Sequence, residues 1–427
     1  MPKQQPAVQQ FVLLPTRGLQ ARQPHSSPAV RSALLFLYDH LQDPKVQPPA
    51  GVRLPLADMR VLDSIHADGA KLIEMCPEAA SVLRASYPGL RIVPVVYFYP
   101  AVAPRQGIAA VRAKTTKRVA GKLTVQVLSG SGDGPVTGAT VVAFTDFASR
   151  AGAAGTTDAN GRVSLALGAS SKKIDRLYIY AQRGFWGLLK RSFTLTNGMT
   201  FTLRAIDLSY VDELRYIYPN IPATAGGGVS VGVIDTGIAD HPDLTIAGGQ
   251  NTVVGEAPSD YGDNGEGHGT HVAGIIAAHG TPPKGVRGVA PVSFPASDPL
   301  SIAVSALGRK GTYPADAVEG GDVMAPFATS DPDYYITSFS NVGPEIALTG
   351  PGDGIISTFP GGYAVLDGTS MATPAATGAA ARLLGMRNEV MQMPRDAARS
   401  DAIAQLLLQS AKPLGLGITF EGRGLLS

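Results

Sequence analysis

Three polar residues stand in segments whose composition suits nucleophilic catalysis. Asp235 ends the segment "VGVID", His268 lies within "GEGHGTH", and Ser370 lies within "LDGTSMA". A serine hydroxyl is a weak nucleophile at neutral pH and needs an adjacent base. Imidazole has the side-chain pKa nearest the working range, and a carboxylate can fix its tautomer and stabilise the imidazolium. Asp235, His268 and Ser370 are therefore candidate partners in acyl transfer.

Each of these signals is ambiguous by itself. An Asp before Thr-Gly can simply cap a turn, a His can be satisfied at a helix start, and "GTS" is a common N-cap sequence. The joint pattern is far more specific. The chain order Asp, His, Ser occurs within three extended motifs, "VGVIDTGI", "GEGHGTHVAG" and "LDGTSMATPAATGAA".

From about residue 215 the sequence alternates apolar strands with Gly/Ala-rich helices, which predicts an α/β domain over 215–427 with a parallel sheet. Residues 229–234 form a β-branched run typical of a strand buried on both faces. That run would place Asp235 at the carboxyl end of a strand. "HVAGIIAAH" and "MATPAATGAAARLLGM" predict helices that start near His268 and Ser370, where free N–H groups favour negative charge.

These motifs resemble the Asp, His and Ser signatures of the subtilase family of serine peptidases. "ADHPDL", "GVRGVAP", "FPASDPLSIAV", "SFSNVGPEI" and "GRGLL" are similar to further family segments in the same order. The resemblance implies that Asp235 orients the imidazole, His268 acts as general base and then acid, and Ser370 attacks the scissile carbonyl. It also implies that the substrate is a polypeptide.

The sequence departs from the family after Pro291. His268 and Ser370 are several tens of residues closer than in the family, and the shortfall falls where "GVRGVAP" meets "VSFPASDPLSIAV". Central strands that carry a wall of the specificity pocket and the oxyanion-hole Asn are predicted to be missing. Asn264 and Asn341 have ordinary loop environments and are not expected to replace that Asn. Either a compact variant or an internal deletion would explain the join.

Two smaller modules are predicted before the peptidase domain. Residues 1–110 suggest an α+β module with strands at 54–64 and 91–98 and a helix over 71–85 that buries Cys76. Its segments "VLDSIHADGAKLIEM" and "LRIVPV" resemble a subtilase propeptide, which implies a folding chaperone and an intramolecular inhibitor. Where processing would cut is open, and 215–228 is one candidate stretch.

Residues 119–206 change to strict apolar–polar alternation, which predicts a β-sandwich. Strands are expected around Leu123–Val127, 141–144, 163–167, 177–180 and 201–203. The pair Asn160-Gly161 in "TTDANGR" predicts a β-hairpin turn. The stretch resembles carboxypeptidase-regulatory-like sandwiches, which implies an accessory role.

Composition excludes several other classes of protein. The formal net charge of +2 and the basic stretch from Arg112 to Lys122, which lacks aromatics, indicate no nucleic-acid partner. A single cysteine excludes a disulfide framework or multi-cysteine zinc site. No window has a membrane helix or a signal-peptide core, so no membrane partner is expected and localisation stays open. Asp243 matches one family calcium ligand, but "HGTPPKG" lacks the expected Asn side chains, so no metal or cofactor is assigned.

Two functions remain after these observations. The first is a serine endopeptidase that works through an acyl-enzyme, which the three motifs favour. The second is an impaired subtilase relative that serves as a binding or scaffold protein, which the missing oxyanion segment favours. A lipase or esterase is disfavoured because the Gly-x-Ser-x-Gly elbow is absent and the chain order differs.

Overall fold

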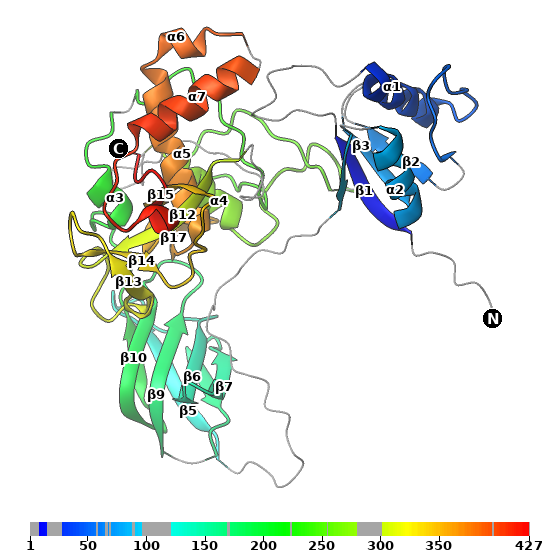
Figure 1. The fold of residues 1–427 in the computed structure, drawn as a ribbon. Coiled ribbons are helices and arrows are strands. Elements are labelled where there is room, and N and C mark those ends of the chain that lie inside the picture. Colours follow the sequence, from blue (N-terminus) through cyan, green and yellow to red (C-terminus); the bar gives the residue numbers. More distant parts are fainter. Residues whose placement is uncertain are drawn as a thin grey trace, which may run out of the picture. The chain divides into compact units, whose positions relative to one another are not determined.

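The computed structural model describes residues 8–14, 28–56, 59–64, 67, 70–87, 90–95, 121–168, 171–222, 224–253, 255–279, 301–394 and 397–426. The chain divides into two compact units, Met1–Ala101 and Val102–Ser427 (Figure 1). The second unit holds both the stretch predicted as a sandwich and the predicted peptidase domain. The basic stretch at 112–118 and the predicted gap after Pro291 lie outside the described residues.

The N-terminal unit is built on a four-stranded antiparallel sheet of order β2-β3-β1-β4. Buried side chains of the sheet and of two helices, among them Leu13, Leu37 and Leu83, form its core. The bounds are β1 (Gln9–Leu14), α1 (Pro28–Gln42), β2 (Met59–Ser64), β3 (Lys71–Met75), α2 (Pro77–Ser86) and β4 (Arg91–Pro94).

The helix predicted over 71–85 is wrong in its first part. Residues 71–75 form β3, which pairs with β1 and β2 on its two edges. Its side chains alternate between buried and half-buried, as expected for a strand. The helix begins only at Pro77, which suits the first helical position. Cys76 is therefore half-buried at the N-cap, where its Sγ accepts the Ala79 N–H at 3.4 Å. The strand expected over 54–64 is limited to β2.

Residues 121–203 form two facing sheets of order β10-β9-β6-β7 and β11-β5-β8 around a shared apolar core. The strands expected at 141–144, 177–180 and 201–203 lie within β6, β9 and β11. The bounds are β5 (Leu123–Ser129), β6 (Thr140–Asp146), β7 (Ala151–Thr156), β8 (Arg162–Leu165), β9 (Ser171–Tyr180), β10 (Leu188–Thr196) and β11 (Thr200–Leu203).

The hairpin predicted at Asn160-Gly161 is wrong, although the turn itself forms. The strands that flank it, β7 and β8, belong to different sheets, so the turn carries the chain from one sheet to the other. Asp158 organises the turn by accepting the N–H groups of Asn160 and Arg162. Gly161 has φ +68° and a Cβ there would lie 2.4 Å from Val127 O, so only glycine fits.

The rest of the second unit contains a mixed sheet of order β13-β14-β12-β15 and a hairpin of β16 and β17, with helices packed against them. The α/β prediction is confirmed, but within this mixed sheet only β12 and β15 run parallel. The bounds are α3 (Glu213–Ile217), α4 (His268–Ala277), β12 (Ala303–Arg309), η2 (Val318–Gly321), β13 (Val323–Phe327), β14 (Tyr334–Thr337), β15 (Ile346–Pro351), β16 (Ile355–Phe359), β17 (Gly362–Leu366), α5 (Thr369–Gly385), α6 (Asn388–Met391), α7 (Ala397–Ser410) and α8 (Ile418–Glu421).

The prediction of a strand buried on both faces at 229–234 is wrong. The segment pairs with no described strand, and its residues alternate between half-buried and exposed. Val229, Val231 and Val233 pack on the apolar core, whereas Ile234 is 75% exposed. A β-branched run forms a strand only where neighbouring strands offer hydrogen bonds. Asp235 therefore follows a segment that has no strand partner among the described residues.

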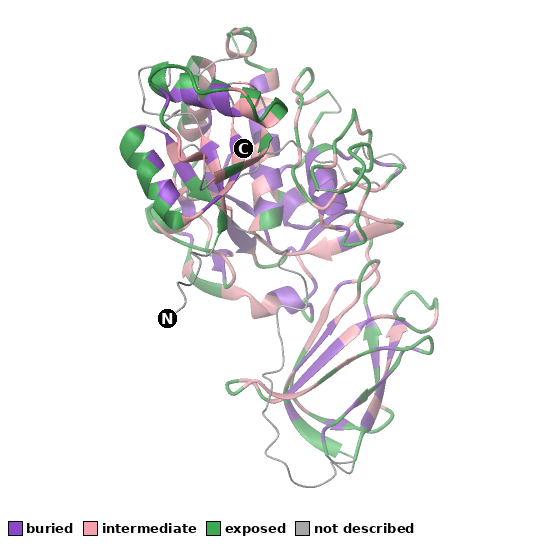
Figure 2. Cartoon of the chain, turned by 90° about the vertical axis from the view of Figure 1, so that its right-hand side faces the viewer, coloured by how far each residue is buried: buried purple, intermediate pink, exposed green. Residues whose placement is uncertain are grey.

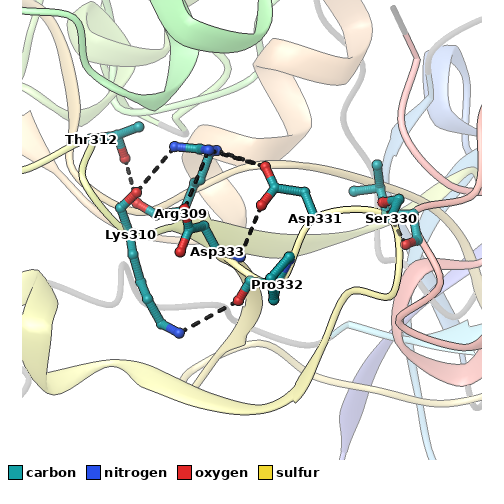
Figure 3. A network of polar contacts seen from close by, with 8 residues as sticks. Arg309, Lys310, Thr312, Ser330, Asp331, Pro332 and Asp333 are labelled. Carbon is teal, nitrogen blue, oxygen red and sulfur yellow. Dashed lines mark hydrogen bonds and ion pairs between the residues drawn. The ribbon is translucent and has the colours of Figure 1, made fainter.

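Two sets of contacts fix the surroundings of the mixed sheet. Arg309 at the end of β12 pairs with Asp331 at 3.0 Å, and Lys310 Nζ reaches Pro332 O, which ties β12 to the loop before β14 (Figure 3). The sandwich packs on η2 and on the hairpin through backbone hydrogen bonds from Leu189 to Asp316 and from Gly184 to Tyr363.

Burial follows these elements, with buried residues on strands and helices and exposed ones mostly in loops (Figure 2). None of the helices in the described part of the chain is long and apolar enough to cross a membrane.

Candidate active site

The structure brings Asp235 and His268 into direct contact. His268 Nδ1 lies 2.7 Å from Asp235 Oδ1, and the side chains are 26% and 14% exposed, respectively. A carboxylate at this distance accepts the Nδ1 proton, so the unprotonated Nε2 is left to act as a base. The second contact of Asp235 Oδ1 is the Thr236 N–H at 2.7 Å, which orients the carboxylate.

The turn before His268 is set by Asp263, which sequence reasoning missed. Its carboxylate accepts the N–H groups of Gly265 and Gly267 and contacts the Thr270 hydroxyl. Gly267 has φ +71° and is the N-cap of α4, so His268 is the first helical residue, as predicted. The spacing Asp-x-Gly-x-Gly is the signal that could have revealed this Asx-type turn.

A close approach of backbone brings the start of α4 onto Asp235. A Cβ added at Gly269 would lie 2.2 Å from Gly237 O and 3.1 Å from Asp235 Cβ. The Gly269 N–H donates to Thr236 Oγ1 at 3.0 Å, which joins the two segments from the other side. Glycine at position 269 is thus a condition for the contact between Asp235 and His268.

Ser370 lies in the first turn of α5, as predicted, and is exposed. Helices α4 and α5 pack against each other, and their side chains share one apolar core that includes Ile275 and Ala375. The structure places Ser370 on the helix beside that of His268. Among the described residues, no hydrogen bond joins His268 Nε2 to the Ser370 hydroxyl. Such contacts are often long without substrate and tighten when it binds.

The electrostatics of the pair favour a charged Asp235. Burial alone would raise the pKa of this carboxyl, but the hydrogen bond and charge interaction with His268 and the Thr236 N–H outweigh burial and lower the pKa. The carboxylate therefore stays ionised at neutral pH and can stabilise an imidazolium at His268.

The other histidines near the site have structural surroundings. His271 is fully buried, and its Nε2 lies 3.1 Å from both Ile355 O and Ala364 O across the β16–β17 hairpin. Burial lowers the pKa of His271 to about 3, so it is neutral at ordinary pH. His241 contacts the carbonyl of Gly362, and His279 contacts the Thr245 hydroxyl.

Neither asparagine considered from the sequence is placed as an oxyanion donor. Asn264 is exposed, and its side-chain oxygen accepts the Glu266 N–H within the turn before α4. Asn341 is exposed in the loop between β14 and β15. In the first turn of α5 the Met371 and Ala372 N–H groups donate to Gly368 O, which leaves those of Thr369 and Ser370 as the first-turn donors without an intrahelical acceptor.

Asp243, the one match to a family calcium ligand, is fully buried beside Tyr363. Across the described ranges no group of three or more His, Cys, Asp or Glu side chains is arranged to hold a metal ion. Residues 280–285 of the loop "HGTPPKG" lie outside those ranges.

Comparison with known proteins places this geometry in a family. The subtilase family profile matches residues 226–293 and 290–424. Thermostable alkaline protease of Halalkalibacterium halodurans is 38% identical over 212 residues, which cover 36% of this chain and 56% of that protein. Subtilisin BL of Lederbergia lenta is 35% identical over 212 residues, covering 36% of this chain and 76% of that protein. Intracellular serine protease of Paenibacillus polymyxa is 32% identical over 264 residues, which cover 48% of this chain and 80% of that protein.

The chain thus spans little more than half the length of the first relative and three quarters or more of the other two. The profile matches in two parts, whose break at residues 290–293 is the place where the sequence departs from the family. Together with the identities above, these matches show that the chain belongs to the subtilase family of serine peptidases.

Proposed function

We propose that this protein is a serine endopeptidase in which Asp235, His268 and Ser370 form the catalytic triad. The observation that carries the proposal is the 2.7 Å contact between His268 Nδ1 and Asp235 Oδ1, on a helix packed beside the helix that starts at Ser370. Family membership and the names of the relatives, all proteases or subtilisins, support the same reaction. Polypeptides are the proposed substrates.

The proposed reaction has two stages, acylation and deacylation, and in each stage His268 accepts a proton and then donates it. His268 Nε2 takes the proton of the Ser370 hydroxyl as its oxygen attacks the carbonyl carbon of the scissile peptide bond. Asp235 stabilises the resulting imidazolium. His268 then gives the proton to the leaving amine, and an acyl-enzyme ester forms on Ser370. His268 then deprotonates a water that attacks the ester carbonyl, and returns this proton to Ser370 Oγ as the ester C–O bond breaks and the acid product leaves.

Negative charge on the carbonyl oxygen is proposed to be stabilised by N–H groups at the start of α5, where the helix dipole also favours an anion. Losing one oxyanion donor typically costs about 10²–10³ in turnover. Because no Asn side chain among the described residues is placed to serve as that donor, we expect turnover lower than that of the relatives. A cavity of about 790 Å³ lies beside the loop after Asp235 and the loop before His268, and its lining includes Ile238, His241, Tyr261, Asp263 and Pro360. It offers room for a substrate chain.

The test is covalent labelling of the purified full chain with a fluorophosphonate, which reacts with activated serines. We expect labelling of the wild type and a modified peptide that contains Ser370. Ser370→Ala and His268→Ala should abolish labelling while their circular dichroism stays that of the wild type. Folded wild type that takes up no label would contradict the proposal and leave a binding or scaffold protein of the same family as the explanation.

The N-terminal unit is proposed to act as an intramolecular inhibitor of this activity. The proposal is supported by the propeptide-like segments of the sequence and by the unit's own compact core. Limited proteolysis of the full chain between the two units should increase the labelling rate at Ser370. An unchanged or lower rate after complete cleavage would contradict an inhibitory role.

A further inference from the structure

Buried carboxyl groups gather next to the segment that carries Ser370, and the proposed reaction does not use them. Glu213, Glu319 and Asp353 are 0%, 1% and 0% exposed. They come from three places in the chain: the start of α3, the short helix η2 and the turn between β15 and β16. Buried carboxyl groups are rare unless they are paired, so this cluster needs a physical explanation.

A hydrogen bond connects two members of the cluster, Glu213 and Asp353. Glu213 Oε2 accepts the Asp353 N–H at 3.4 Å, and Asp353 Oδ2 accepts the Tyr335 hydroxyl at 2.5 Å. Glu213 Oε1 and Glu319 Oε2 are buried with no hydrogen-bond partner in the part of the chain that the structure describes. A buried ionised carboxylate with an empty acceptor is destabilised far more strongly than a protonated one.

The charges around the cluster do not neutralise it. The nearest arginine in sequence, Arg215, is 3.6 Å from Asp212, which itself accepts the Ile356 N–H. Arg191 donates to the carbonyl of Gly320. The titratable groups that interact electrostatically with Glu213 are Asp212, Tyr218, Tyr313, Tyr334 and Asp353, and those that interact with Glu319 are Tyr210, Tyr313, Asp322, Asp353 and Asp367.

Two hydrogen bonds, here called the clamp, join the turn that contains Asp353 to the segment that leads to the nucleophile. Asp367 Oδ1 accepts the Gly354 N–H at 2.8 Å, and the Gly368 N–H donates to Gly352 O at 2.8 Å. These two hydrogen bonds join the turn around Asp353 to the residues directly before Thr369 and Ser370. Negative charge on Glu213 or Glu319 would repel Asp353 and Asp367 and so act on this clamp.

We propose that Glu213 and Glu319 are positioning residues that, while protonated, hold the turn before Ser370 through Asp353 and Asp367, so that raising the pH releases the nucleophile. The consequence for catalysis rests on the proposed function, but the structural switch does not. Glu213 and Glu319 touch neither substrate nor the reacting atoms and act only through the clamp.

The direction of the pH dependence follows from the environment. Burial, and then the nearby Asp353, raises the pKa of Glu213 well above its usual range. Burial, and then the nearby Asp367 and Asp353, does the same to Glu319. Because the pKa is raised in the folded chain, the stabilisation is complete below the pKa of an unfolded Glu and is lost as the pH rises through the folded pKa.

The chain carries a reporter at this cluster. Trp186 is its single tryptophan and is 2% exposed. It packs at Gly354, because a Cβ at that position would meet Trp186 Cζ3 at 3.3 Å and Glu319 Cγ at 3.4 Å. Its fluorescence therefore reports on ionisation of Glu319 and on movement of the turn at Gly354, independently of any catalysis.

The test compares the full-length wild type with Glu213→Gln/Glu319→Gln and with the matched control Glu389→Gln, an exposed glutamate on α6. Three quantities are followed from roughly pH 5 to pH 10. They are Trp186 fluorescence, hydrogen exchange of peptides spanning 352–370 corrected for the intrinsic pH dependence, and the fluorophosphonate labelling rate. The single variants Glu213→Gln and Glu319→Gln serve if the double variant does not fold, because each removes one ionisable group.

We expect fluorescence and exchange of the wild type and the control to change together as the pH rises, and their labelling rate, divided by that of the double variant at the same pH, to fall at least about tenfold over the same range. The double variant should show none of the three changes. A wild-type chain with no such transition, or a transition that persists unchanged in the glutamine variants, would overturn the proposal. A glutamate-dependent transition in a chain that never labels would support the switch and count against the proposed peptidase function. Labelling that stays constant across a glutamate-dependent transition would overturn the link to Ser370.

Discussion

Replacing Gly269 by Ala tests whether the contact between Asp235 and His268 depends on the close approach of α4. The added Cβ would lie 2.2 Å from Gly237 O, whereas ordinary contact begins near 3.4 Å, so the start of α4 must move away by about 1 Å. A shift of that size stretches the 2.7 Å contact of His268 beyond hydrogen-bond distance. Misplacement of about 1 Å typically costs about 10² in rate, and we expect that loss in the labelling rate at Ser370.

A fall in the labelling rate of Gly269→Ala could not come from helix propensity, because propensity acts in the opposite direction. Alanine is favoured over glycine inside a helix by about 1 kcal/mol, so propensity alone would leave α4 as stable or more so. Gly232→Ala is the matched control, because a Cβ there meets nothing within 4 Å. Both variants should be compared with the wild type by circular dichroism and by labelling rate. A folded Gly269→Ala chain that labels within about threefold of the wild type would refute the reasoning, since a 1 Å shift should cost far more.

Three further predictions concern the pair, the core and the sheet. Asp235→Asn should lower the labelling rate by about 10⁴ by favouring the wrong His268 tautomer, and a loss below tenfold would speak against that role. The pKa of His271 is about 3 in the folded chain and 6.5 in the unfolded one. Urea unfolding should therefore show that the free energy of unfolding decreases as the pH is lowered from 6.5 to about 3, by up to about 5 kcal/mol. A His271→Gln chain with the wild-type pH slope would show that another group is responsible. Arg309→Ala should cost about 0.5–1 kcal/mol in urea unfolding through the lost ion pair with Asp331, with Arg309→Lys recovering only part, and full recovery by Lys would show that donation from both Nε and Nη2 to Asp331 Oδ2 adds nothing.

The parts of the site that the sequence predicted are local ones. Glycine followed by small apolar residues predicted that helices start near His268 and Ser370, and both do. The contact of Asp235 with His268 was expected from motifs that occur in a fixed order. The helix starts depend on residues within a few positions of each other, whereas Asp235 and His268 are 33 residues apart and were paired from the order of their motifs.

The parts that failed depend on distant partners. The β-branched run 229–234 predicted a buried strand, but whether a run is paired depends on which strands lie beside it, and none of the described strands does. Residues 71–75 were expected in a helix, yet pairing with β1 and β2 makes them a strand. The strand β7, "AGAAGT", escaped prediction because its Gly152 and Gly155 have low strand propensity. A Cβ at Gly152 would lie 2.0 Å from Ala143 O on the neighbouring strand.

Buried charge was equally hidden from the sequence. Glu213 and Glu319 look like surface residues in a linear pattern, since glutamate is almost never fully buried. Only the fold brings them to Asp353, next to the turn before Ser370. The same holds for Asp263, whose role became clear only when its contacts with Gly265 and Gly267 were known.

The central claim is that Asp235, His268 and Ser370 act as one catalytic unit, and turnover of a peptide by three variants tests it most directly. Rates should be measured for the wild type, Ser370→Ala, His268→Ala and the double variant, all purified in parallel. Residues of a triad act together, so removing either one costs about as much as removing both. We predict a wild-type rate well above background, with all three variants at one common residual rate. A wild type no faster than Ser370→Ala, or a double variant slower than each single variant by the product of their effects, would contradict the account.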